Sequence, residues 1–201
     1  MRVGRGQPSP TPAAAVATWL LIIAALFAAP GGWAAQQVDP ALRAALKKAI
    51  NDHDGFKNRY NAEVWLMDMS HRLKDRMPNP ARRIRFLREV HYEAVRAHLR
   101  PEWVLAVIDV ESNFKRFAIS STGAEGYMQV MPFWLKEIGH PEDNLFKLRT
   151  NLRMGCTILR YYLNKEHDNL VRALARYNGS IGSNQYPGKV LEVLEHRWFV
   201  Q

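Results

Sequence analysis

Residues 103–114 read Trp-Val-Leu-Ala-Val-Ile-Asp-Val-Glu-Ser-Asn-Phe, and Pro101 predicts that a helix begins just before them. Val104, Val107 and Ile108 lie seven, four and three positions before Glu111, spacings that place all four side chains on one helix face. Glu111 therefore continues an apolar stripe. A carboxyl group that loses water in this way has a raised pKa, and it can stay protonated near neutral pH as a general acid must.

The same residue has an ordinary interpretation as well. A glutamate near the end of a helix is usually exposed or paired with a lysine or arginine. Perturbed carboxyl groups also occur in purely structural networks. The choice between these interpretations depends on the rest of the chain.

The N-terminal residues have the order of an export signal. Arg2 and Arg5 precede an uncharged segment, residues 13–29, and small residues follow up to Ala34 and Ala35. We expect residues 1–35 to be a signal peptide, with cleavage near Ala34 or Ala35 and a periplasmic location. The alternative is an uncleaved membrane anchor, although the apolar segment is shorter than the roughly 20 residues that a bilayer helix needs.

The composition indicates a basic protein that does not depend on disulfides. The chain has 28 basic and 19 acidic residues, a formal net charge of +9, and one cysteine, Cys156, which cannot form an internal disulfide. Such basicity suggests an anionic partner. The dense cluster Arg82–Arg88 predicts the solvated face of an amphipathic helix, with Ile84, Leu87, Val90 and His91 turned inward. No nucleic-acid motif surrounds it, so we expect no nucleic-acid partner.

Most of the chain predicts helices, since apolar residues recur three or four positions apart and no stretch alternates long enough for a sheet. Residues 120–126 have the composition of a loop or a short hairpin. The expected fold class is all-α, with at most a minimal β-hairpin. The expected helices cover residues 40–50, 56–77, 81–98, 101–114, 128–131, 151–165, 169–177 and 189–198.

Four short blocks follow one another in the second half of the chain. They read VESNF at 110–114, GAEGYMQVMP at 123–132, NLRMG at 151–155 and ALARYNGS at 173–180. Each block alone is weak, but their order and spacing resemble the catalytic domain of the soluble lytic transglycosylases. This lysozyme-like family cleaves peptidoglycan, and the resemblance runs from about Leu99 to Val193.

The resemblance implies a lysozyme-like domain over residues 96–201, with residues 36–95 as a helical extension packed on it. It also implies that Glu111 is the catalytic acid. It assigns substrate contacts to Ser120, Gln129, Met131, Tyr177, Asn178 and Tyr186. Two positions depart from the family pattern, because Tyr127 replaces the usual leucine and Ile158 stands where an aromatic residue often occurs.

Several of these residues have structural alternatives. Met131 could belong to the core, as we expect of Met128, and Gln129 could cap a turn. Tyr177 and Asn178 could simply end a helix, with Gly179 in the left-handed conformation.

A glycosidase normally uses two carboxyl groups. Asp109 is only two positions from Glu111, which on a helix points it away, and we expect it to be solvated or paired along the helix. Glu125 is the remaining candidate. The resemblance implies a mechanism without a second carboxylate, in which Glu111 acts first as acid and then as base and a 1,6-anhydro product forms.

We therefore expect an exported lytic transglycosylase that acts on peptidoglycan strands as a monomer. It would need no cofactor, and the seven histidines show no metal-ligand spacing, so no metal is expected. A lysozyme-like hydrolase and a glycan-binding component of a cell-envelope assembly remain alternatives. A protein partner within cell-envelope machinery is a further alternative.

Overall fold

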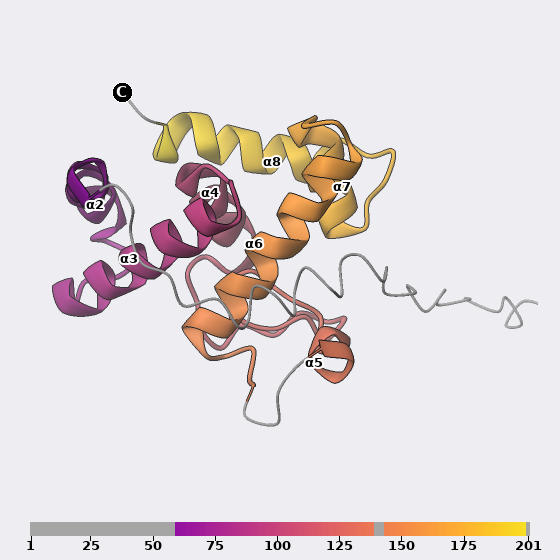
Figure 1. The fold of residues 1–201 in the computed structure, drawn as a ribbon, viewed down its shortest axis with the longest axis horizontal. Coiled ribbons are helices and arrows are strands. Elements are labelled where there is room, and N and C mark those ends of the chain that lie inside the picture. The colour runs from indigo at the N-terminus through magenta and orange to yellow at the C-terminus, as the bar shows by residue number, and fades with distance from the viewer. Residues whose placement is uncertain (1–58, 139–142, 200–201) are drawn as a thin grey trace, which may run out of the picture. The chain divides into compact units, whose positions relative to one another are not determined.

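The computed structural model describes residues 59–138 and 143–199 (Figure 1). The helix expected at 40–50 and the expected signal peptide at 1–35 lie outside these residues. Within the described ranges the fold is helical and contains no strand, only two isolated β-bridges, which confirms the all-α prediction with a minimal hairpin.

The described residues form seven α-helices followed by one π-helical segment, and most of these begin or end within a few residues of the expected positions. They are α2 (Arg59–Leu73), α3 (Pro80–Arg96), α4 (Pro101–Ser112), α5 (Phe133–Ile138), α6 (Leu148–Lys165), α7 (Leu170–Asn178), α8 (Gln185–Val193) and the π-helix η1 (Leu194–Trp198).

Helix α3 shows how local sequence starts a helix. The side chain of Asn79 accepts a hydrogen bond from the Arg82 N–H, and Pro80 occupies the first turn, where a missing N–H costs nothing. Arg82, Arg85 and Arg88 are exposed while Leu87 and Val90 are buried, so the amphipathic interpretation of the basic cluster is confirmed.

Helix α4 runs through the centre of the fold. Every residue from Val104 to Asp109 is buried, and the helix packs against α3, α8 and η1 (Figure 1). It ends at Ser112, two residues before the expected end. The reason is Asn113, whose φ of 47° is left-handed and whose N–H caps the helix by bonding to the Asp109 carbonyl.

A chain of aromatic rings holds the elements around α4 together. Phe86 of α3 packs on Tyr127 and Phe114, with ring centroids 4.9 and 5.9 Å apart, and Phe114 packs on Trp198 of η1 at 5.5 Å. Tyr127, which departs from the family pattern, is thus a core residue rather than a residue of a substrate groove. Ring pairs of this kind contribute about 0.5–1.5 kcal/mol each beyond burial.

The segment after α4 differs from the expectation at one place. Residues 128–131 were predicted to be helical, but 126–129 form a turn between bridges that pair Glu125 with Ile119 and with Val130. The turn needs left-handed backbone at Gly126 (φ 75°) and Gln129 (φ 48°), which a helix cannot supply.

Two residues of helix α6 hold this turn in its conformation. The side-chain amide of Asn151, fully buried, donates to the Glu125 carbonyl at 2.9 Å and accepts from the Met128 N–H at 2.8 Å. One helical turn later, Gly155 lies against Met128, which is completely buried as expected. The Asn-x-x-x-Gly spacing puts both residues on the helix face that meets the turn.

The C-terminal helix begins at Gln185, four residues earlier than expected, and Pro187 fits because it lies in the first turn. The chain then continues as η1. Asp109 accepts hydrogen bonds there from the Trp198 indole at 3.0 Å and from Arg197 at 3.1 and 3.2 Å. The expectation that Asp109 is solvated or paired along its own helix is wrong, since it is buried and anchors another element.

The elements before α4 share its core. Helix α3 packs against α4 and α6, and α2 packs against α3 and η1. The buried Glu93 of α3 bonds to Arg96 at 2.6 Å and to Arg153 of α6 at 2.9 Å. Cys156 is fully buried. Within residues 59–138 and 143–199, no helix is long and apolar enough to cross a membrane.

The contact between Gly155 and Met128 predicts a specific sensitivity. A Cβ atom at position 155 would lie 2.4 Å from the Met128 sulfur and 2.8 Å from its Cβ. We expect Gly155→Ala to lower the free energy of unfolding by about 1–3 kcal/mol, the usual cost of overpacking. Urea denaturation measures this. The matched control is Gly188→Ala, where nothing lies within 4 Å of the added carbon and no comparable loss should appear.

Candidate active site

The carboxyl group of Glu111 lies in the last turn of α4 and meets the first turn of α8. The Tyr186 hydroxyl donates a hydrogen bond to Glu111 Oε1 at 2.7 Å, and Tyr186 itself is buried. Residues 75 positions apart in sequence are thereby joined in one partly buried pair.

Burial raises the pKa of Glu111 from the ordinary 4.5 to about 7, and the hydrogen bond from Tyr186 partly opposes this by lowering it. The cause is desolvation, which disfavours the charged carboxylate. A carboxyl group with a pKa near 7 can donate a proton and take one back at neutral pH, which is the property that acid–base catalysis requires.

Tyr177, at the end of α7, completes the immediate surroundings of the acid. Its hydroxyl donates to the Met128 carbonyl at 2.8 Å. Burial first, and then the charge of Glu111, raise the pKa values of Tyr177 and Tyr186 well above the usual 10. Both phenols therefore remain neutral, and Tyr177 also ties α7 to the 126–129 turn.

Ser112, next to the acid, has a structural role. Its hydroxyl lies 2.8 Å from the Tyr127 carbonyl oxygen and 3.1 Å from that of Ile108, and shares its hydrogen between them. The end of α4 is thus bonded to the turn that follows it in the chain.

Gln129 and Ser120, two of the residues predicted to contact substrate, form hydrogen bonds within the 118–130 loop. The Gln129 amide nitrogen donates to the carbonyls of Ala118 and Gly126 at 3.1 and 2.9 Å, which leaves its carbonyl oxygen as the group that a ligand could use. The Ser120 hydroxyl bonds to Thr122 and accepts from the Ala124 N–H, each at 2.9 Å.

The remaining predicted contacts lie on other parts of the surface and core. Asn178 is exposed and is the last residue of α7, with Gly179 in the left-handed conformation (φ 77°), so the helix-end interpretation describes its backbone. Met131 is half-buried and packs against the hydrophobic core. The assignment of these residues to substrate stays a prediction.

The surroundings of Glu111 contain no partner carboxylate among the described residues. Desolvation and the Tyr186 hydrogen bond account for its pKa shift, and neither Glu125 nor Asp109 is among the causes. Glu125 is held in the turn through its backbone, which bonds to Val130 and Asn151. Asp109 is committed to Arg197 and Trp198.

Asn151 and Gly155 contribute to the site without having been predicted as site residues. They set the conformation of the turn that carries Met128 and Gln129. They therefore also position the Met128 carbonyl, which accepts the hydrogen bond from Tyr177. The signal that could have identified them was their four-residue spacing, which predicts a common helix face. No group of three or more histidine, cysteine or acidic side chains within the described ranges is placed to hold a metal.

This chain belongs to the transglycosylase SLT domain family, whose model matches residues 90–190. The matched region contains Glu111, both tyrosines and the entire 118–130 loop. Helices α4 to α7 and the acid with its raised pKa thus lie within the matched transglycosylase domain.

Individual relatives cover part of the chain. A transglycosylase of Enterobacteria phage PRD1 is 32% identical over 101 residues, which are 47% of this chain and 37% of that protein. The solved structure of an inactive variant of the lytic transglycosylase Slt from Pseudomonas aeruginosa is 30% identical, with a TM-score of 0.40, and covers 52% of this chain and 17% of that one. The chain therefore spans well under half the length of either relative.

The bond from Tyr186 predicts how the acid titrates. Because this hydrogen bond stabilises the ionised carboxylate, Tyr186→Phe should raise the pKa of Glu111 further above about 7. Carbon-13 NMR titration of the labelled Glu111 carboxyl group measures it directly. Tyr161→Phe, on the half-buried tyrosine of α6, is the matched control and should leave the titration unchanged. An unchanged or lower pKa in Tyr186→Phe would contradict the assignment.

Desolvation of Glu111 also predicts a pH-dependent stability. Its folded pKa lies above its unfolded one, so its contribution to stability is intact below pH 4.5 and is lost as the pH rises to about 7. Glu111→Gln removes this loss. The variant should match the wild type near pH 4 and be more stable by about 1–3 kcal/mol at pH 8, less than the full shift because the Tyr186 bond weakens. Thermal unfolding across this pH range tests the difference, and equal stability at pH 8 would refute it.

Proposed function

We propose that this protein is a lytic transglycosylase that cleaves the bond between N-acetylmuramic acid and N-acetylglucosamine in peptidoglycan without adding water, leaving 1,6-anhydro ends. Membership of the transglycosylase family supports the reaction class. The periplasm is the compartment that we propose, on the basis of the export-like order of residues 1–35.

The single observation that carries the proposal is the environment of Glu111: a desolvated carboxyl group with a pKa of about 7 that bonds to the Tyr186 hydroxyl and to no second carboxylate among the described residues. A hydrolase of the two-carboxylate type needs a second acidic group close to the first. A second ionised group at that distance would raise the pKa of Glu111 by repulsion, yet only burial raises it here.

In the proposed reaction, protonated Glu111 gives its proton to the glycosidic oxygen, and the bond between that oxygen and the anomeric carbon breaks. The acetamido oxygen of the muramic acid stabilises the positive charge at that carbon. Ionised Glu111 then takes the proton from the sugar's own 6-hydroxyl, whose oxygen bonds to the anomeric carbon and closes the anhydro ring. The carboxyl group ends protonated, so the cycle consumes no water and no external acid.

Tyr186 suits both halves of this cycle. Its hydrogen bond stabilises Glu111 when the carboxyl group is ionised, between the two proton transfers, and its own raised pKa keeps the phenol protonated. Tyr177 is positioned as a second neutral phenol, and the carbonyl oxygen of Gln129 is the group that we propose to accept a hydrogen bond from the substrate.

Product analysis tests the function. Purified peptidoglycan digested by the wild type should release muropeptides that lack one water relative to hydrolysis products, as measured by mass spectrometry. Glu111→Gln should release them at least 100-fold more slowly, since general acid–base groups contribute about 10²–10⁴ in rate. Reducing ends instead of anhydro ends would identify a hydrolase. Binding of the strands without any cleavage by the wild type would identify a glycan-binding protein.

A further inference from the structure

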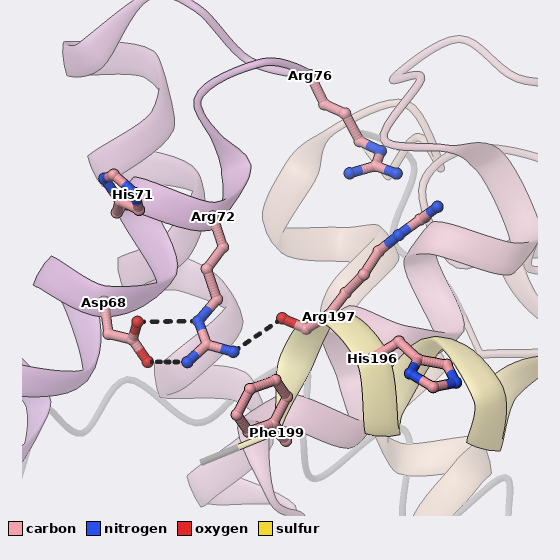
Figure 2. A pocket seen from close by; sticks show the side chains of 7 residues that line it. All are labelled: Asp68, His71, Arg72, Arg76, His196, Arg197 and Phe199. Atoms are coloured by element: carbon pink, nitrogen blue, oxygen red, sulfur yellow. Dashed lines mark hydrogen bonds and ion pairs between the residues drawn. The ribbon is translucent and has the colours of Figure 1, made fainter. Parts of the chain in front are cut away.

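A second polar site lies on the opposite side of α4 from the acid. Asp109 and Glu111 are two residues apart, which on an α-helix separates their directions by about 200°. Glu111 meets Tyr186, whereas Asp109 bonds to Arg197, which lines a cavity of about 430 Å³ between α2 and the C-terminal residues (Figure 2). Three arginines line this cavity, namely Arg72, Arg76 and Arg197.

Arg72 is held rigidly within the cavity. Its guanidinium makes two hydrogen bonds of 2.8 Å to the Asp68 carboxylate one helical turn earlier, and a third, of 3.0 Å, to the backbone carbonyl of Arg197 (Figure 2). These bonds use three of the five N–H donors of the group, so two more can serve a ligand. Their fixed fork matches an oxyanion.

Arg76, in the turn after α2, and Arg197 of η1 also line the cavity. Both of them contact Asp109, Arg197 at 3.1 Å and Arg76 at 3.7 Å, and Arg76 Nε also donates to Asn113 at 2.9 Å. Their side chains are 48% and 26% exposed, so solvent and solutes reach them. The side-chain entropy that a flexible arginine loses on binding a ligand is thus already partly lost in the free protein.

The charges of this cluster do not balance. Three arginines face two carboxylates, Asp68 and Asp109, which leaves one positive charge in excess. His71 and His196 also line the cavity and add to the excess when protonated. Nothing in the proposed reaction at Glu111 uses these groups.

The rim of the cavity is aromatic. Phe199 is 39% exposed, and the Arg72 guanidinium lies 4.5 Å from its ring centroid (Figure 2). An exposed aromatic ring beside arginines favours a ligand in which an anionic group adjoins an apolar group.

We propose that the cavity between α2 and η1 is a binding site for a phosphate group. A phosphate is favoured over a carboxylate because it carries more charge, about −1.5 to −2 for a monoester, and offers three strong acceptor oxygens to three guanidiniums. This site goes beyond the proposed function and does not rest on it, because it uses none of the residues around Glu111.

Two probes separate the sources of such a group. Inorganic pyrophosphate represents a free phosphate, and vesicles of phosphatidylglycerol represent a lipid headgroup, with phosphatidylcholine vesicles as the uncharged comparison. Pyrophosphate binding is followed by NMR of the arginine Nε–H signals, and vesicle binding by co-sedimentation. We expect the signals of Arg72, Arg76 and Arg197 to shift. Binding of pyrophosphate alone would identify a soluble phosphate ligand, and retention on the anionic vesicles alone would identify a headgroup.

Paired variants make the test specific. Arg72→Gln should weaken binding about tenfold, and Asp68→Asn, which removes a competing negative charge, should strengthen it. The control is Arg85→Gln, which removes the same charge from the exposed face of α3 and should leave binding unchanged. Equal losses in Arg72→Gln and Arg85→Gln, or no response to either probe, would overturn the proposal. Circular dichroism verifies that each variant is folded.

Discussion

The second half of helix α4 carries the carboxyl groups of Asp109 and Glu111 into a largely apolar interior, and this constraint organises the structure around it. Asp109 is satisfied by charge and hydrogen bonds from Arg197 and Trp198, so it serves as an anchor. Within the described part of the chain, Glu111 has the neutral hydroxyl of Tyr186 as its hydrogen-bond partner. Two acidic residues separated by one valine thus acquire different properties from their partners: Asp109 holds η1 in place, whereas burial raises the pKa of Glu111 to about 7.

The other residues of the site stabilise the surroundings of the Glu111 carboxyl group. The phenol of Tyr177 and the hydroxyl of Ser112 both bond to carbonyls of the turn after α4, at Met128 and Tyr127. The turn itself depends on Asn151 and on the absence of a side chain at Gly155. Family motifs that look unrelated in sequence are therefore parts of one hydrogen-bonded support for the carboxyl group.

Much of this could be predicted from the sequence because it depends on periodicity. The apolar stripe ending at Glu111 predicted both the buried helix and the raised pKa, and the amphipathic pattern around Leu87 predicted which face of α3 is buried. The helix at 128–131 was wrongly predicted because hydrophobic spacing does not reveal that Gly126 and Gln129 adopt left-handed conformations. The partners of Asp109 could not be predicted either, since Arg197 and Trp198 lie 88 and 89 residues away and periodicity carries no long-range pairing.

The π-helical turn η1 sets the relative directions of two side chains, Tyr186 and Trp198, that contact α4. Tyr186 at the start of α8 meets Glu111, and Trp198 at the end of η1 meets Asp109. A π-helical turn contains an extra residue compared with an α-helical one. If Leu194–Trp198 were regular α-helix with the same number of residues, the Trp198 indole would be rotated by about 100° around the helix axis relative to Tyr186. Tyr186 would still reach Glu111, but Asp109 would lose the Trp198 indole as a donor. The π-helical turn therefore allows one C-terminal segment to bond to both sides of α4 at once.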